Sequence, residues 1–196
     1  MTSSARHTVR WGLAAALAAL LFTATAPISQ AAAVVTCDGK VATIVGTPGN
    51  DEIEGTSGDD VIHGLAGNDE IEGKGGNDVI CGGVGSDEIE GDAGNDIIRG
   101  GSGNDDVEGG AGTDDVSGGT GHDKVEGDSG NDRLWGGRGN DKVEGGSGND
   151  RLWGNAGNDV LEGYAGDDTL IGGAGSDRAE GGRGNDTCSA EVRQSC

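Results

Sequence analysis

The chain has 196 residues, of which 43 are glycine, a formal net charge of -22 and only 3% aromatic residues. So much glycine and acid with so little bulk excludes an ordinary globular domain with a thick apolar core, because glycine loses the most backbone entropy on folding. The acidic balance argues against nucleic acid as a partner, since its phosphates would be repelled, and favours metal cations.

Residues 1–33 have the pattern of a Sec-type signal peptide. Basic residues near the start precede an apolar run over residues 11–23, and the small residues that follow predict cleavage after Ala31 or Ala33. The alternative is a membrane anchor, but the run is shorter than the roughly 20 apolar residues of a spanning helix. We therefore expect no membrane span and a secreted, extracellular protein. Without the leader the net charge would be about -24.

Residues 46–189 form an unbroken array of sixteen nonapeptide units. Glycine occupies positions 1 and 4 of every unit, aspartate occupies position 6, and position 8 is always apolar. The array is preceded by a predicted cap strand within residues 34–45 and followed by a C-terminal cap, residues 190–196. The position-6 aspartates are Asp51, Asp60, Asp69, Asp78, Asp87, Asp96, Asp105, Asp114, Asp123, Asp132, Asp141, Asp150, Asp159, Asp168, Asp177 and Asp186.

Each unit predicts a turn followed by a short strand. Positions 7 to 9 are expected to form a three-residue strand, in which the uniformly apolar position 8 faces inward and positions 7 and 9 face outward. Positions 1 to 6 are expected to form the turn, because their glycines permit a positive φ and close backbone approach. Each turn thus presents one carboxylate at a fixed place.

A second period appears at position 9, which is glutamate in every odd-numbered unit and varies in the even-numbered units. The true period is therefore 18 residues, so that two nonapeptides make one turn of a flattened coil. We name its two outer surfaces the odd face and the even face, after the units whose positions 7 and 9 form them. Eight turns at about 4.8 Å would make a rod roughly 38 Å long.

Three units fit the pattern GGxGxDxUx, with U apolar, residue for residue: 100–108 (GGSGNDDVE), 136–144 (GGRGNDKVE) and 145–153 (GGSGNDRLW). The array resembles the RTX (haemolysin-type) calcium-binding repeat, and the leader and terminal cysteines resemble stand-alone secreted proteins of actinobacteria. The resemblance implies an all-β fold, a right-handed parallel β-roll of about eight 18-residue turns. It also implies Ca²⁺ between consecutive turns, held by the position-6 aspartates and backbone carbonyls.

Some units depart from glycine at position 2, and these departures cluster in the first four units. They matter little if position 2 donates only a carbonyl, but the clustering predicts weaker sites at that end. The departures are Thr47, Thr56, Leu65, Lys74, Asp92, Asp128, Asn155 and Tyr164.

Calcium fits this composition better than other metals do. Ca²⁺ takes six to eight oxygen ligands in flexible geometry, whereas zinc would need His or thiolate ligands at spacings that are missing here, and Mg²⁺ needs tighter geometry. Eight turns leave seven gaps on each edge, or about 14 ions. One apolar side chain per nine residues is too little core, so we expect folding and metal binding to be one equilibrium. The alternative is a metal-free glycine-rich coil.

Four cysteines in a secreted chain predict two disulfides. In such a roll Cys81 and Cys188 would lie about six turns, or about 29 Å, apart, too far for a bond that needs Cα atoms within about 7 Å. The roll then favours Cys37 with Cys81, which ties down an N-terminal cap strand over residues 41–45. It also favours Cys188 with Cys196, which seals the last turn. Free or redox-active pairs are the alternative.

The two faces differ in chemistry. The odd face is acidic in its first half, which is typical of a solvated surface, although it could also dock a cationic surface. On the even face Trp135 and Trp153 lie one turn apart, next to Arg133 and Arg151, with Val61, Val79 and Ile97 predicted to point outward earlier on. This set could bind a cell-surface glycan or protein, or the two tryptophans could simply reinforce the sheet.

No catalytic constellation is visible in the sequence. His63 and His122 lie on different units with no nucleophile beside either. We therefore expect no enzyme. The favoured hypothesis is an extracellular calcium-binding protein, a buffer or a structural element of the cell surface, in which calcium drives folding. The alternative is a calcium-dependent adhesion or ligand-binding module that uses the Trp135 and Trp153 face.

Overall fold

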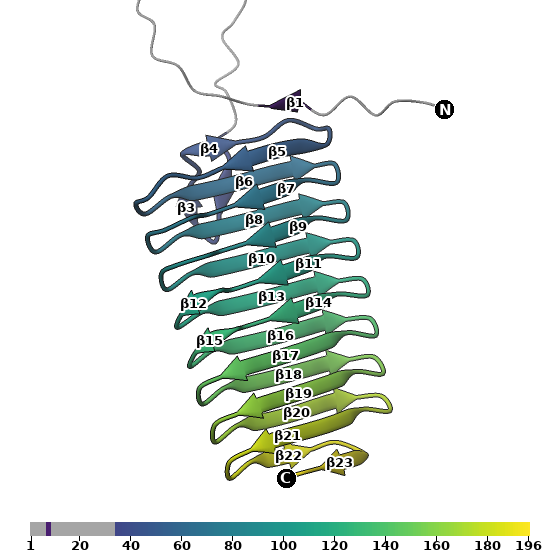
Figure 1. Ribbon diagram of the computed structural model, residues 1–196. Coiled ribbons are helices and arrows are strands. Elements are labelled where there is room, and N and C mark those ends of the chain that lie inside the picture. Colours follow the sequence, from purple (N-terminus) through teal and green to yellow (C-terminus); the bar gives the residue numbers. More distant parts are fainter. Residues whose placement is uncertain (1–6, 9–33) are drawn as a thin grey trace, which may run out of the picture.

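The computed structural model of the protein describes residues 7–8 and 34–196, and the predicted signal peptide otherwise lies outside the described residues. The described chain is built of strands and turns that wind into one long coil (Figure 1). Among these residues there is no helix long and apolar enough to span a membrane.

The strands follow one another at nearly regular intervals along the chain. In order they are β1 (His7–Thr8), β2 (Thr36–Cys37), β3 (Lys40–Val41), β4 (Ile44–Val45), β5 (Asp51–Glu54), β6 (Val61–Ala66), β7 (Glu70–Glu72), β8 (Val79–Val84), β9 (Glu88–Glu90), β10 (Ile97–Ser102), β11 (Asp106–Glu108), β12 (Ala111–Gly112), β13 (Asp115–Thr120), β14 (Lys124–Glu126), β15 (Ser129–Gly130), β16 (Arg133–Arg138), β17 (Lys142–Ser147), β18 (Arg151–Ala156), β19 (Val160–Ala165), β20 (Thr169–Ala174), β21 (Arg178–Arg183), β22 (Thr187–Ser189) and β23 (Val192–Gln194).

Two parallel sheets form the walls of the coil. The odd units make one sheet, ordered β1-β5-β7-β9-β11-β14-β17-β19-β21-β23 with β12 and β15 beside it, and the even units make the other, ordered β4-β6-β8-β10-β13-β16-β18-β20-β22. Within the array, neighbouring strands pair at an offset of 18 residues, as in Ile98 with Val116 and Val107 with Val125. The predicted parallel β-roll with 18-residue turns is confirmed.

The strands are longer than the predicted three residues throughout most of the even-unit sheet. There they run for six residues, from position 7 of one unit to position 3 of the next, as in β10 and β16. In the odd-unit sheet the first strands stop after position 9, and only β17, β19 and β21 extend in the same way. The turn is therefore confined to positions 4 to 6 wherever the ladder continues past the glycine at position 1.

The core is a single file of position-8 side chains between the two sheets. From Ile53 to Ala179 each is buried, and most have no exposed surface. Ile44 and Cys188 pack against the two ends of this file. Because each turn contributes only two such side chains, apolar burial per residue is small, and the polar edges must decide whether the roll is stable.

Disulfides close both ends of the roll. Cys37 and Cys81 are bonded with a Cα–Cα distance of 5.7 Å, and Cys188 and Cys196 with a distance of 5.8 Å, as predicted. The predicted cap strand over residues 41–45 is shorter than expected: only β4 joins the even-unit sheet, and β3 instead pairs antiparallel with β2.

The β2–β3 hairpin changes the surroundings of one residue predicted to point outward. Val79 is in β8, next to the disulfide-bonded Cys81, and only 1% of its surface is exposed. Strand β2 contacts both β6 and β8. The N-terminal part of the even face is therefore partly covered by the cap, and its open part begins further along the roll.

Candidate metal sites along the turn edges

The sixteen position-6 aspartates lie in two ladders, one along each edge of the roll. In each ladder one carboxylate oxygen, Oδ1, accepts a hydrogen bond from the backbone N–H of the aspartate one turn earlier. Asp78 donates to Asp96 and Asp96 donates to Asp114, each over 2.8 Å. At the C-terminal end Glu191 takes the place of a further aspartate and accepts from the N–H of Asp177 over 2.7 Å. Each carboxylate from Asp69 to Asp186 is thus fixed by the backbone of the preceding turn.

In fourteen of these sixteen carboxylates the second oxygen has no partner. From Asp69 to Asp186, fourteen Oδ2 atoms are buried and make no hydrogen bond. Except for Asp186, these residues are buried, with 1–3% of their surface exposed. A buried carboxylate oxygen without a donor is costly, and native structures contain few such atoms without a specific reason. A repeated row of buried anionic oxygens fits a row of cation-binding sites.

The space beside each free oxygen is kept open by the glycine at position 1. A Cβ atom built on Gly73 would lie 2.8 Å from Oδ2 of Asp78 and 2.9 Å from the carbonyl oxygen of Gly91, one turn further along. Carboxylate and carbonyl oxygens thus line the same small cradle, which any side chain would fill. These are the ligands that Ca²⁺ prefers.

No group of three or more His, Cys, Asp or Glu side chains in the described chain could enclose a metal ion. An ion held in the cradle of Asp78 would therefore depend on backbone carbonyls as well as on carboxylates. This ligand set suits calcium and does not suit zinc, which binds nitrogen and sulfur. The residues present fit the metal that the sequence predicts.

The first turn of the roll differs from the other seven. In units 1 and 2 the Oδ2 atoms of Asp51 and Asp60 accept hydrogen bonds from the backbone N–H and the hydroxyl of Thr47 and Thr56 respectively. In all fourteen later units position 2 has a positive φ, whether it is glycine or not. Thr47 and Thr56 do not share this conformation. A positive φ at position 2 therefore accompanies every free Oδ2 atom.

This correlation changes the meaning of the departures from glycine at position 2. Leu65, Lys74 and Tyr164 have φ values of 82°, 76° and 71°. An ordinary side chain in the left-handed region costs roughly 1–2 kcal/mol. Position 2 therefore matters through its backbone conformation as well as through its carbonyl. Because Leu65 and Lys74 adopt the common conformation, we now expect weaker calcium sites only in the first two units, and not in the first four.

Burial perturbs the carboxylates in the middle of the ladders. Removal from water, with repulsion between successive aspartates as a smaller cause, raises the pKa of Asp96, Asp105 and Asp132 to about 7. The same causes raise the pKa of Asp159 and Asp168 to about 6. Without a cation these groups hold a proton more readily than they would in water, so protons and cations compete for them.

A second ladder, which the sequence did not predict, runs at position 5. There the side-chain acceptor of one unit receives the backbone N–H of the residue one turn later, as from Asn158 to Asn140 and from Asn140 to Nδ1 of His122, each over 2.8 Å. It runs opposite in direction to the aspartate ladder. Its signal was visible, because position 5 is Asn, Asp, Ser, Thr or His in every unit.

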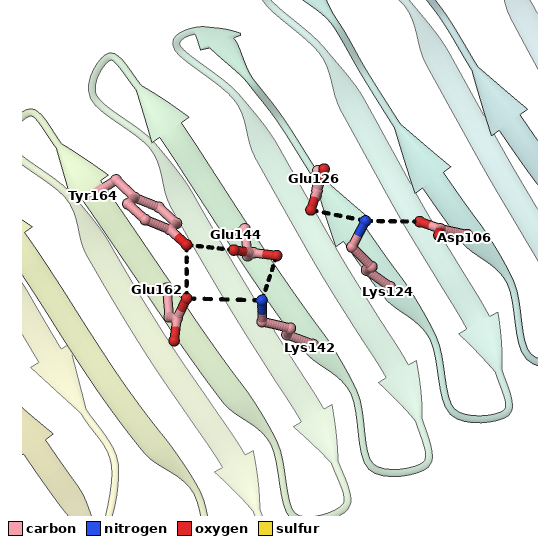
Figure 2. Close-up of polar contacts among 7 residues, drawn as sticks. All are labelled: Asp106, Lys124, Glu126, Lys142, Glu144, Glu162 and Tyr164. Carbon is pink, nitrogen blue, oxygen red and sulfur yellow. Dashed lines mark hydrogen bonds and ion pairs between the residues drawn. The ribbon is translucent and has the colours of Figure 1, made fainter.

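The odd face has its own polar network, and its basic residues are used within it (Figure 2). Lys124 lies 3.2 Å from Asp106 and 2.9 Å from Glu126, and Lys142 lies 2.7 Å from Glu144. The Tyr164 hydroxyl also reaches Glu144 and is 2.9 Å from Glu162.

The cluster around Glu144 shifts the titration of that side chain. Burial opposes ionisation, but hydrogen bonds from Lys142 and Tyr164 outweigh it and lower the pKa of Glu144 to about 2. Glu144 is thereby held ionised, with its countercharge supplied by Lys142 of the same sheet, whereas burial raises the pKa of its neighbour Glu126.

On the even face the predicted aromatic pair is brought together. The rings of Trp135 and Trp153 are stacked with centroids 4.9 Å apart and planes inclined by 6°. Arg133 and Arg151 are register partners in the same two strands, β16 and β18. Unlike the lysines of the odd face, neither arginine makes an ion pair with another described residue.

Comparison with known proteins agrees with this geometry. The family described as the RTX calcium-binding nonapeptide repeat matches residues 45–80, 82–116, 117–152 and 153–188. These four segments cover most of the chain, and the protein belongs to this family. No curated protein matches the chain. Membership supports a calcium-binding repeat protein, and the two disulfides are consistent with an extracellular location.

Proposed function

We propose that this protein is secreted and binds calcium outside the cell, and that calcium binding drives the folding of its β-roll. The observation that carries the proposal is the row of fourteen buried Oδ2 atoms without partners, each beside a glycine cradle. Bound Ca²⁺ would supply the positive charge that these oxygens lack. The position-6 aspartates from Asp69 to Asp186 would be its side-chain ligands, with backbone carbonyls completing the set.

The number of free oxygens supports a stoichiometry of about fourteen ions. Fourteen divalent ions would also offset a net charge near -24. Without them, carboxylates would stack at the strand spacing of about 4.8 Å around a single file of core residues. We therefore expect the apo chain to be largely unfolded under neutral conditions, with the two disulfides as its main remaining constraints.

The test is a far-UV circular dichroism titration of EDTA-stripped protein with Ca²⁺, with Mg²⁺ as the matched control ion. We expect a cooperative transition from coil to β structure with Ca²⁺ alone. A spectrum already rich in β structure in EDTA would show that calcium does not drive folding. No transition at millimolar Ca²⁺ would overturn the calcium proposal itself. Secretion is tested separately, by N-terminal sequencing of protein from the culture medium.

A further inference from the structure

The two faces of the roll carry opposite charge. Of the sixteen outward positions on the odd face, twelve are acidic and three are basic, whereas the even face has one acidic residue, Asp115, and three arginines. Asp115 is already paired with Arg99 at 2.6 Å. The even face is therefore the one broad surface of the array that an anion could approach without meeting a row of carboxylates.

Arg133 and Arg151 stand out on this face. They lie opposite each other in a parallel ladder, where like charges destabilise a sheet. Both are exposed, and neither makes an ion pair with a described residue. The register neighbour of Arg133 on its other side is Asp115, whose carboxylate is paired with Arg99. On the odd face, by contrast, Lys124, Lys142 and Arg178 each have a carboxylate partner. A repulsive pair left without a countercharge, in a chain with 35 acidic residues, is explained if an external anion supplies that charge.

The surroundings favour a sugar polymer as that anion. Each arginine is two residues from a tryptophan on the same strand and therefore on the same side of the sheet. The stacked rings of Trp135 and Trp153 are half-exposed, with the small Ser117 in register on one side and the exposed Ile171 on the other. Half-exposed aromatic surface beside a polar group suits a ligand that is apolar on one side and hydrogen-bonding on the other. A pyranose ring has this character.

A groove at the start of the same strands extends the surface. It has a volume of about 530 Å³ and its lining includes Arg133, Arg151 and Thr169, together with Asn131, Asn149 and the exposed Asp167. Asp132 and Asp150 also line it and are among the aspartates proposed to hold calcium, which would offset their negative charge but not that of Asp167. An anion is thus expected to bind the calcium-loaded protein.

We propose that the arginine–tryptophan patch, made of Arg133, Trp135, Arg151 and Trp153, binds an acidic polysaccharide that carries sulfate or carboxylate groups. The guanidinium groups bind the anionic substituents, and the tryptophan pair contacts the sugar rings. Because the arginines repeat at the strand spacing, the ligand is an extended chain that runs along the roll and not a single monosaccharide.

The test uses the full-length calcium-loaded chain in a Trp11→Phe background, so that fluorescence comes from Trp135 and Trp153 alone. The probes are dextran sulfate and hyaluronan, with neutral dextran and poly-L-glutamate as controls. We expect a saturable change in fluorescence with at least one charged sugar polymer and none with either control. Equal binding of poly-L-glutamate would overturn the assignment to a sugar, and no binding of either sugar polymer would overturn the proposal.

Matched variants locate the site. Arg133→Gln with Arg151→Gln is expected to weaken binding at least tenfold, whereas Arg138→Gln with Arg183→Gln makes the same change of charge at exposed arginines outside the patch and should have less than a twofold effect. Trp135→Ala with Trp153→Ala, followed by affinity electrophoresis, should also weaken binding at least tenfold. Circular dichroism in saturating Ca²⁺ confirms that each variant is folded. Equal weakening by both arginine pairs would contradict a defined patch.

Discussion

The first turn of the roll and the seven turns after it contain aspartates at the same position of the repeat, but the hydrogen bonds of their carboxylates differ. Asp51 and Asp60 are satisfied by the chain itself, through Thr47 and Thr56, whereas the fourteen later carboxylates each keep one buried oxygen free. The difference accompanies the backbone conformation at position 2. A left-handed residue there turns its N–H away from the aspartate, so the need for a cation depends on the backbone as much as on the acid.

The largest expected effect comes from removing acids in the second group. We expect Asp105→Asn with Asp114→Asn to lower the stability of the calcium-loaded roll by about 3 kcal/mol or more, because amides cannot replace buried charged ligands. Bound calcium, measured by elemental analysis, should fall by at least two ions. Asp51→Asn with Asp60→Asn should leave the calcium content unchanged. An equal loss of calcium in both pairs would contradict the distinction between the first turn and the rest.

Acid should partly replace calcium in the metal-free protein. The folded-state pKa of Asp96, Asp105 and Asp132 is raised to about 7, whereas an unfolded aspartate titrates near about 3.9. Between these values the roll binds protons that the unfolded chain releases, so the stability of the metal-free roll is highest near pH 4 and falls as pH rises to 7.

Circular dichroism in EDTA at pH 4 and pH 7 measures this effect, with the calcium-loaded protein as the reference. Calcium-loaded protein should show the opposite trend, because protons displace the metal. More β structure at pH 7 than at pH 4 in EDTA would show that these carboxylates are not buried in the metal-free chain.

A smaller effect is expected from substitutions that let the first turn adopt the backbone conformation of the later turns. Thr47→Gly with Thr56→Gly permits the positive φ that the other fourteen units share, and it removes the hydroxyls that bind Asp51 and Asp60. We expect up to two additional calcium ions per chain. We also expect the metal-free roll, at pH 4 where it is most stable, to lose about 1 kcal/mol of folding stability per hydrogen-bonded threonine. An unchanged calcium content would show that position 2 does not control access to the carboxylate.

The smallest effect concerns side chains already held in the left-handed region. Leu65→Gly should stabilise the calcium-loaded roll by about 1 kcal/mol, because leucine is strained at a φ of 82°. Asn155→Gly is the matched control and should change the stability by only a few tenths of a kcal/mol, because asparagine tolerates this conformation. Thermal unfolding of both variants in saturating Ca²⁺ makes the comparison.

Sequence reasoning reached the two-sheet roll because position 9 alternates independently of the turn motif, and it reached both disulfides because the roll limits which cysteines can meet. It did not predict the features that depend on backbone conformation. Glycine and leucine at position 2 look different in sequence but share one conformation. The two units that differ have threonine there, the only β-branched residue type at this position, and this signal for the sign of φ was not used. The position-5 ladder was overlooked because its acceptors vary in chemical type, and Glu191 lies outside the repeat that it completes.

The 18-residue register also limits how the chain can change its length. Removing nine residues between Trp135 and Trp153 would exchange the two sheets for everything downstream, so that Trp153 would enter the row of glutamates and lose its partner Trp135. Removing eighteen would leave every later side chain on its own face and both ladders continuous. Insertions and deletions in the array are therefore expected to come in multiples of 18 residues. Related proteins of different length should differ by an even number of nonapeptides.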